Sequence, residues 1–138
     1  MSQDRQPVVA MPLRVRFHEC DPQGIVFNAH YLAYFDMASF EFFDALFGSY
    51  DSLRDRGVDC VVAESNLRYH APSRFGDELV VEVAIDHVGT TSLILAFTVR
   101  RGEDLVCAGT NRYVFVDAST LDKATPPEDV RATLLARA

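Results

Sequence analysis

The sequence has 138 residues and a formal net charge of −7, with twelve arginines but only one lysine. A folded chain of this length buries about 70% of the surface that its unfolded form exposes, so residues 1–138 are expected to form one domain that needs no disulfide or metal for stability. The acidic balance argues against nucleic acid as a partner, because binding to phosphate backbones requires a dense basic face.

The three cysteines, Cys20, Cys60 and Cys107, are odd in number and widely separated. This pattern disfavours a disulfide framework and a structural zinc site, and it suits a reducing compartment. The N-terminal segment lacks the basic and apolar regions of a secretory signal, and no apolar stretch is long enough to cross a bilayer. We therefore expect a cytoplasmic protein with no membrane span and no bound metal.

The first half of the chain predicts one strand and one long helix. Residues 1–9 are polar and unpatterned, and we expect them to form a flexible leader. Residues 12–19, PLRVRFHE, alternate apolar and charged side chains, which predicts a half-buried strand. Residues 29–48 form a long run without proline that is apolar on almost all sides and ends at Gly48, which predicts a helix enclosed by other elements. Asn28 is its expected N-cap.

The second half predicts a sheet. A polar and partly helical connector, residues 51–60, leads into four β-type runs separated by turn residues, and the spacing is typical of an antiparallel meander. These runs cover residues 60–69, 78–88, 92–101 and 105–117. The tail, residues 118–138, contains Pro126 and Pro127 before two acidic residues, which predicts a short terminal helix. The order predicts an α+β domain in which one helix packs on an antiparallel sheet.

The segment HECDPQGIVFNAHY, residues 18–31, combines acids, imidazoles and a turn in a way that a core does not need. Asp21 precedes the turn Pro22-Gln23-Gly24 and lies seven residues before Asn28, so it can fold back toward the helix start. The free N–H groups of a helix start bind an oxyanion, and a carboxylate beside them suits acyl transfer. From these residues alone, an ordinary Asp-Pro turn is the more common reading.

Residues 21–43, DPQGIVFNAHYLAYFDMASFEFF, resemble the signature of the 4-hydroxybenzoyl-CoA thioesterase-like (YbgC-type) branch of the hotdog-fold acyl-CoA thioesterases. That signature has an Asp, two residues, Gly-Ile-Val-Phe, and then a Tyr entering the helix. Residues 61–83, VVAESNLRYHAPSRFGDELVVEV, are similar to the same family, so the resemblance covers the chain from Leu13 to Asp117. It implies a hotdog fold, in which five or six antiparallel strands wrap around the long central helix.

The resemblance implies that the protein hydrolyses the thioester of a small aromatic or a short- to medium-chain acyl-CoA. Asp21 would be the nucleophile or the general base, and the backbone N–H of Asn28 would donate to the thioester carbonyl. Relatives often carry His or Tyr at the latter position, so only a backbone role carries over to Asn28. No cofactor is implied, because coenzyme A is part of the substrate.

Further site residues follow from the resemblance and from residue type. Gly24 is expected to supply a backbone φ that other residues resist, and Phe35 is a further candidate for the wall of the acyl pocket. The expected substrate-binding residues are Gly24, Ile25, Val26, Phe27, Tyr31, Cys60, Val61 and Val62. Guanidinium groups suit the phosphates of coenzyme A, although solvated strand ends explain the same arginines equally well. These candidates are Arg68, Arg74, Arg100 and Arg101.

Three other titratable side chains have weaker claims to a role. Glu41 lies on the central helix, where some hotdog thioesterases place their carboxylate. Glu64 stands in a mostly apolar strand, where an unpaired charge is costly, so we expect it to pair with an arginine such as Arg68. We expect His30 to be a solvated or capping residue rather than a helper base.

The family buries a sheet edge by dimerising, and many of its members are dimers of dimers. The resemblance therefore implies at least a homodimer, up to a homotetramer, with Val58 to Val62 of one chain approaching Asp21 of the other. A non-hydrolytic acyl-CoA-binding protein on the same fold is the alternative function.

Overall fold

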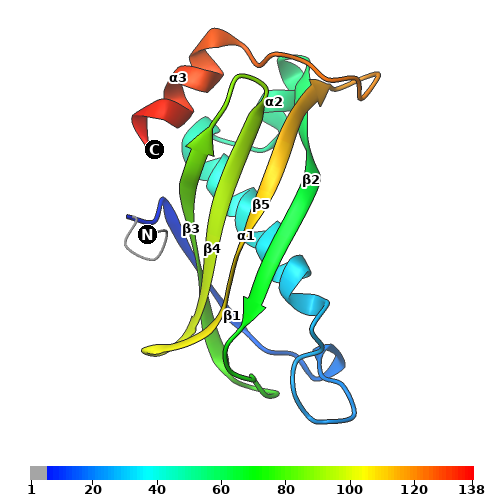
Figure 1. Cartoon of the computed structure of the whole chain (residues 1–138), viewed down its shortest axis with the longest axis vertical. Helices are drawn as coiled ribbons and strands as arrows, with labels where there is room; N and C mark the ends of the chain where they lie inside the picture. Colours follow the sequence, from blue (N-terminus) through cyan, green and yellow to red (C-terminus); the bar gives the residue numbers. More distant parts are fainter. Residues whose placement is uncertain (1–5) are drawn as a thin grey trace.

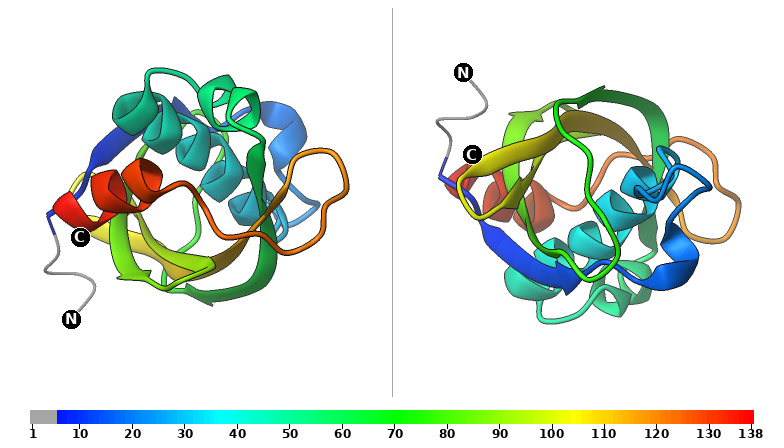
Figure 2. Two further views of the ribbon diagram at one scale, coloured as in Figure 1. Left: turned by 90° about the horizontal axis from the view of Figure 1, so that it is seen from above. Right: turned by 90° about the horizontal axis from the view of Figure 1, so that it is seen from below.

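One long helix and a five-stranded antiparallel sheet make up most of the computed structural model, which describes residues 6–138 (Figure 1). The sheet curls around the helix, as views from above and below show (Figure 2). This is the α+β arrangement that the sequence predicts. In chain order, the elements are β1 (Val9–Arg14), the 3-10 turn η2 (Phe17–Glu19), α1 (His30–Phe47), α2 (Asp51–Asp55), β2 (Val58–Tyr69), β3 (Glu78–Val88), β4 (Ser92–Arg101), β5 (Asp104–Asp117) and α3 (Glu128–Ala136).

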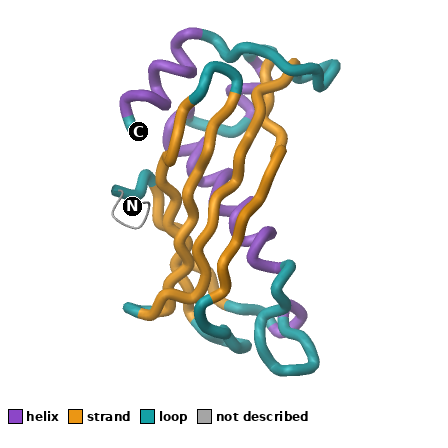
Figure 3. The backbone as a smooth tube through the Cα atoms, viewed as in Figure 1, coloured by secondary structure: helices purple, strands orange, loops and turns teal. Residues whose placement is uncertain are grey.

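The strands follow the order β1-β3-β4-β5-β2, and all neighbours are antiparallel (Figure 3). The predicted boundaries of the last four strands agree with the structure to within two residues, but the predicted meander is wrong for β2. This strand pairs with β5 at the far edge and not with β3. Residues 70–77 make the connection, and they are more numerous than the two to five residues that a hairpin loop uses.

β1 starts and ends earlier than predicted. Its inward side chains are half buried and alternate with exposed ones, including Pro12. A proline without an N–H is tolerated there because β1 lies at an edge of the sheet. The predicted leader is therefore wrong at Val8 and Val9, since the Val8 N–H donates to the Val83 carbonyl at 2.7 Å; residues 1–5 lie outside the described part of the chain.

Residues 17–19 form η2 because a buried carboxylate holds the chain there. Glu19 is 5% exposed, and its side chain accepts hydrogen bonds from the Arg16 N–H at 2.8 Å and from the Tyr34 hydroxyl at 2.9 Å. The Arg16 guanidinium pairs with it at 3.2 Å. Burial by itself raises the pKa of Glu19, but these hydrogen bonds and the guanidinium outweigh it and lower the pKa below its usual value.

α1 ends as predicted but begins one residue late. Gly48 takes a φ of +86° directly after the last turn, which is the expected glycine stop. Ala29 occupies the N-cap position and no side chain caps the helix, so the prediction of Asn28 as N-cap is wrong. The His30 N–H donates to the Phe27 carbonyl at 2.9 Å, and this preceding turn moves the helix start beyond Asn28.

The concave face of the sheet packs on one side of α1. Phe35 is fully buried and stacks on Phe97 of β4, with ring centroids 4.4 Å apart. Burying such a side chain contributes about 1.5–3 kcal/mol. Phe35 is therefore a core residue and not part of a substrate pocket, contrary to the prediction. The opposite side of α1 leaves Phe40 49% exposed, so a single chain does not enclose the helix as predicted.

The C-terminal helix α3 follows Pro127, as predicted, and buries Val130 and Leu134. The Arg131 guanidinium donates to the Gly89 carbonyl at 3.0 Å, which fixes α3 to the turn between β3 and β4. No helix within residues 6–138 is long and apolar enough to cross a membrane. All three cysteines are free thiols.

β2 approaches β5 most closely at Gly109. A Cβ atom at this position would lie 2.2 Å from the Asn66 carbonyl oxygen and 3.0 Å from the Leu67 Cα. Backbone atoms cannot move away as a flexible side chain could, so glycine is required here for space. The register of β2 leads directly to Tyr69 at its end, and the contact at Gly109 thus helps to position that residue.

We expect Gly109→Ala to lower the free energy of unfolding by about 3 kcal/mol, because β2 must shift away from β5. Gly102→Ala is the matched control, since a Cβ there has nothing within 4 Å and meets only the cost of a φ of +62°, about 1 kcal/mol. Urea denaturation of both variants measures the difference. A Gly109→Ala variant no less stable than Gly102→Ala would contradict this account.

Glu19 should also make stability depend on pH. Its folded-state pKa lies below its ordinary value of 4.5, so the ionised carboxylate stabilises the fold above that pH, and this contribution is lost as the pH falls through the folded-state pKa. Between about pH 5.5 and about pH 3.5, the wild type should lose more unfolding free energy than Glu19→Gln. Urea denaturation at each pH tests this. Glu41→Gln, which removes an exposed carboxylate on α1, is the control and should lose as much unfolding free energy as the wild type. Equal losses in the wild type and Glu19→Gln would exclude the assigned role of Glu19.

Candidate active site

The loop between η2 and α1 folds back on itself. Cys20 and Val26 form an isolated antiparallel bridge, and the Asp21 N–H donates to the Ile25 carbonyl at 2.9 Å. Gly24, at the turn, has a φ of +78°, as predicted, and its N–H donates to the Asp21 carbonyl at 2.8 Å. The loop therefore returns the chain from Asp21 to the start of α1.

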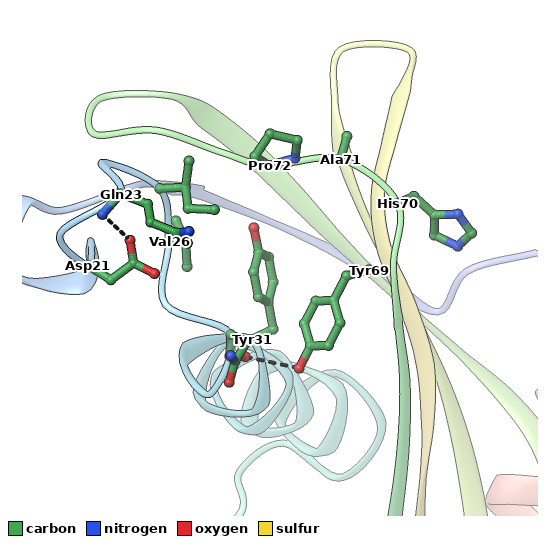
Figure 4. Close-up of a pocket in the computed structure, with 10 residues that line it drawn as sticks. Asp21, Gln23, Val26, Tyr31, Tyr69, His70, Ala71 and Pro72 are labelled. Carbon is green, nitrogen blue, oxygen red and sulfur yellow. Dashed lines mark hydrogen bonds between the residues drawn. The ribbon is translucent and has the colours of Figure 1, made fainter.

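The Asp21 side chain borders a cavity of about 420 Å³ (Figure 4). Its Oδ1 accepts a hydrogen bond from the Gln23 N–H at 2.9 Å, which orients the carboxylate. Within residues 6–138, Oδ2 has no hydrogen-bond partner, and the carboxylate has no ion pair. The Gln23 N–H thus holds Oδ1 in place, and Oδ2 is available to a bound molecule. The cavity is lined by Asp21, Gln23, Ile25, Val26, Asn28, Tyr31, Tyr69, His70, Ala71 and Pro72.

Two main-chain amides at the start of α1 are also available. The Phe27 N–H donates to the Glu19 carbonyl at 2.9 Å, and the His30 N–H donates to the Phe27 carbonyl. Between them, the N–H groups of Asn28 and Ala29 have no acceptor in the described part of the chain. Asn28 lines the same cavity as Asp21. Unpaired amides at the start of an 18-residue helix favour a negatively charged oxygen.

Tyr69 connects the end of β2 to the start of α1. Its hydroxyl donates to the Asn28 carbonyl at 3.1 Å, and its ring meets the Tyr31 ring edge to face at 5.7 Å. The Val26 N–H donates to the Ser73 carbonyl at 2.8 Å, so the segment after β2 is also bound to the loop between η2 and α1. Tyr69 and residues 70–72 were not among the predicted site residues, although the Ala-Pro that follows a strand in the family-like stretch was a usable signal.

Tyr31 gives the cavity a polar group on its inner wall. Its ring stands between Val26 and Tyr69, and its hydroxyl points toward Pro72 (Figure 4). Tyr31 and Ser73 are almost fully buried, and their hydroxyl oxygens have no hydrogen-bond partner in residues 6–138. Burial raises the pKa of Tyr31, although the nearby Ser73 hydroxyl opposes this shift. Tyr31 therefore remains neutral and can hydrogen-bond to a bound molecule.

The predicted substrate-binding residues divide into two groups. Ile25, Val26 and Tyr31 line the cavity, and Gly24 and Phe27 flank it in the chain. Phe27 is 45% exposed, with its ring against His30. In contrast, the three predicted β2 residues do not reach this cavity within one chain. Cys60 and Val62 line a second cavity of about 200 Å³ beside α1, and Val61 faces the opposite side of the sheet.

The four candidate arginines have different surroundings. Arg100 pairs with Glu82 at 3.2 Å. Arg101 donates to the Pro72 carbonyl at 2.6 Å and lies 3.7 Å from Asp77 and 3.6 Å from Asp104. These two arginines support the structure.

The other two candidates are exposed and lie on different sides of β2. Arg68 points to the face of β2 opposite α1. The Arg74 Nη1 lies 3.9 Å from the position that a Cβ on Gly24 would take, beside the loop between η2 and α1. Arg74 alone of the four is thus placed beside that loop.

The remaining acids lie outside the site. Glu64 pairs with Arg112 of β5 at 3.7 Å, so the predicted partner Arg68 is wrong. The register irregularity between Val62 and Glu64 places Glu64 directly opposite Arg112. Glu41 is exposed on α1 and does not line the cavity.

Comparisons with known proteins agree with this fold. The family model of the thioesterase-like superfamily matches residues 15–134. A putative esterase from Aquifex aeolicus is 30% identical over 98 residues, which are 71% of this chain and 76% of that protein. The acyl-CoA thioester hydrolase YbgC of Escherichia coli is 29% identical over 67% of this chain and 69% of its own length. A solved structure of a hypothetical protein from Thermus thermophilus has a TM-score of 0.87 at 27% identity, covering 94% of this chain and 98% of that one. The chain belongs to the thioesterase-like superfamily and has its hotdog fold.

Proposed function

We propose that this thioesterase hydrolyses an acyl-CoA to the free acid and coenzyme A in the cavity beside Asp21. The observation that carries the proposal is the meeting of two groups at one cavity: a carboxylate with one unpaired oxygen, and the unpaired amides at the start of α1. This pairing suits an acyl transfer, in which one group attacks or activates water and the other stabilises an oxyanion.

In the proposed mechanism, the thioester carbonyl oxygen accepts hydrogen bonds from the N–H groups of Asn28 and Ala29. The Asp21 Oδ2 either attacks the carbonyl carbon, forming a mixed anhydride that water then hydrolyses, or takes a proton from the attacking water. The Gln23 N–H holds the other carboxylate oxygen and limits its rotation. The tetrahedral intermediate expels coenzyme A as a thiolate, which is a much weaker base than an alkoxide and therefore leaves without a general acid.

The proposed substrate is a small aromatic or a short- to medium-chain acyl-CoA. The name of the Escherichia coli relative, an acyl-CoA thioester hydrolase, supports a coenzyme A thioester. The cavity volume of about 420 Å³ is in the range of small-molecule sites. Ile25, Val26 and Pro72 offer apolar contacts, and the unpaired Tyr31 hydroxyl offers one hydrogen bond. Release of free thiol from benzoyl, hydroxybenzoyl and straight-chain acyl-CoAs tests the proposal, and binding of all of them without thiol release would favour the non-hydrolytic alternative.

The exposed edge of β2 supports a homodimer. β2 has 12 residues, is exposed along most of its length, and is paired on one side only, with β5. Val62 is 46% exposed, and it lines the second cavity together with Phe40 of α1, which is 49% exposed. A long edge strand with apolar side chains readily pairs with another copy of itself, which would make the two sheets continuous.

Such pairing would join the two cavities across the interface. If two copies of β2 pair antiparallel along their whole length, Val58 of one chain lies opposite Tyr69 of the other. The cavity lined by Cys60 and Val62 would then approach Asp21 of the partner, as the predicted substrate-binding role of these residues requires. Further assembly into a dimer of dimers stays a prediction.

Asp21→Asn should lower kcat by about 10² to 10⁴, because a neutral amide can neither attack nor take a proton. Its Oδ1 can still accept from the Gln23 N–H, so folding and acyl-CoA binding should be nearly unchanged. Thiol release, thermal unfolding and calorimetric binding measure the three properties. Glu41→Gln, which changes an exposed carboxylate on α1, should keep full activity. An Asp21→Asn variant with most of its kcat would remove Asp21 from the mechanism.

Val62→Arg should dissociate the dimer, because each chain would place a guanidinium group inside the apolar contact near the middle of the paired strands, and the two groups would lie close enough to repel each other. Analytical ultracentrifugation should give about twice 15.4 kDa for the wild type and about 15.4 kDa for the variant, with thiol release falling in parallel. Leu135→Arg is the control, since Leu135 is similarly exposed, at 48%, but lies on α3. A monomeric wild type, or a Val62→Arg variant that remains dimeric, would refute the interface.

A further inference from the structure

Two phenylalanines are exposed near the candidate active site. Phe17 of η2 and Phe75 of the loop after β2 have exposed fractions of 77% and 64%, and their rings meet edge to face with centroids 5.8 Å apart. Neither belongs to the hydrophobic core. Because these rings are mostly exposed, they contribute little to the stability of the fold. Two large apolar side chains exposed side by side indicate a contact surface for another molecule.

Arg74 adjoins the aromatic pair in the chain and lies close to the catalytic loop, the loop between η2 and α1 that carries Asp21. It precedes Phe75 in the chain, and its Nη1 is 3.9 Å from the position of a Cβ on Gly24. Among residues 6–138, its guanidinium has neither an ion pair nor a hydrogen bond. An unpaired guanidinium in a chain with a net charge of −7 is available to an anion, and its geometry matches a phosphate.

These residues and the cavity form one continuous surface. Pro72 lines the cavity, and Ser73, Arg74 and Phe75 follow it directly. The bond from the Val26 N–H to the Ser73 carbonyl holds this segment against the catalytic loop, and the bond from the Gly76 N–H to the Val15 carbonyl, at 3.0 Å, holds it against the chain before η2. Both segments lie at the lower end of the molecule in Figure 1.

We propose that this surface binds the nucleotide part of the coenzyme A substrate, with a phosphate group on Arg74 and the adenine ring against Phe17 and Phe75. The inference rests on the proposed function, which places the thioester beside Asp21. Every nucleotide base has a flat π-face that stacks on aromatic side chains, and phosphates pair with guanidinium groups. The pantetheine arm offers neither kind of contact, and the acyl group lies beside Asp21 in the proposed function, so these three residues should act on the nucleotide alone.

The test compares one acyl group on two thiols: coenzyme A, and N-acetylcysteamine, which lacks the nucleotide. Arg74→Gln should lower kcat/KM for the acyl-CoA about tenfold, by raising KM. The same variant should lower kcat/KM for the N-acetylcysteamine thioester by less than about twofold. Phe75→Ala should lower only the acyl-CoA value, about fivefold. Adenosine 3′,5′-bisphosphate should inhibit wild-type acyl-CoA hydrolysis competitively, and Arg74→Gln more weakly. Arg137→Gln changes an exposed arginine directly after α3, at the opposite end of the molecule and away from the edge of β2 (Figure 1), so it is the control and should match the wild type.

Equal losses with both thioesters, or no loss with either, would overturn the inference while leaving the proposed function intact. A Phe75→Ala variant with a changed molecular mass in ultracentrifugation would also overturn it, because the aromatic pair would then contact a second copy of the chain. A wild-type protein that hydrolyses neither thioester would instead refute the proposed function, and this inference with it.

Discussion

The hydrogen bond from the Phe27 N–H to the Glu19 carbonyl determines the geometry of the candidate site. It uses the Phe27 amide, whereas the next two amides, those of Asn28 and Ala29, have no acceptor within residues 6–138. The same residue, Glu19, uses its buried carboxylate to bind the Arg16 N–H and the Tyr34 hydroxyl, so the loop and α1 share one anchor. Glu19 thus fixes the chain on both sides of the loop that carries Asp21 to the start of α1.

The curled sheet has a second consequence for the site. β2 closes the far edge, and its end carries Tyr69 onto the Asn28 carbonyl, beside the cavity. The contact at Gly109, where no side chain fits, holds β2 close to β5. The opposite edge of β2 has no partner in a single chain and is exposed next to apolar side chains of α1. The strand that completes the cavity is thus also the strand that supports dimerisation.

The distribution of charge separates structural arginines from those available for binding. Arg100 and Arg101 pair with carboxylates, and Arg101 also binds the Pro72 carbonyl, which supports the cavity wall. Arg74 has no such partner in the described residues. In an acidic protein, an arginine without a carboxylate partner attracts anions, which supports the proposed contact between Arg74 and a phosphate of coenzyme A.

The sequence by itself determined the features that depend on neighbouring residues. β-type runs between turn residues predicted the last four strands almost to the residue, Gly48 marked the end of α1, and Gly24 was correctly assigned a special φ. The family-like motif around Asp21 indicated the superfamily, which the comparisons confirm. Each of these signals extends over a few residues and depends on backbone geometry that local side chains control.

Only the tertiary structure decided which distant segments meet. It placed β2 beside β5, brought Tyr69 and residues 70–72 to the cavity, paired Glu64 with Arg112, and kept Cys60 and Val62 away from Asp21 within one chain. The physical reason is that these contacts depend on the curvature of the sheet, on the length of the loop after β2 and on one register irregularity. A local pattern of hydrophobic residues reports which side of a strand is buried, but it does not report which strand lies next to it.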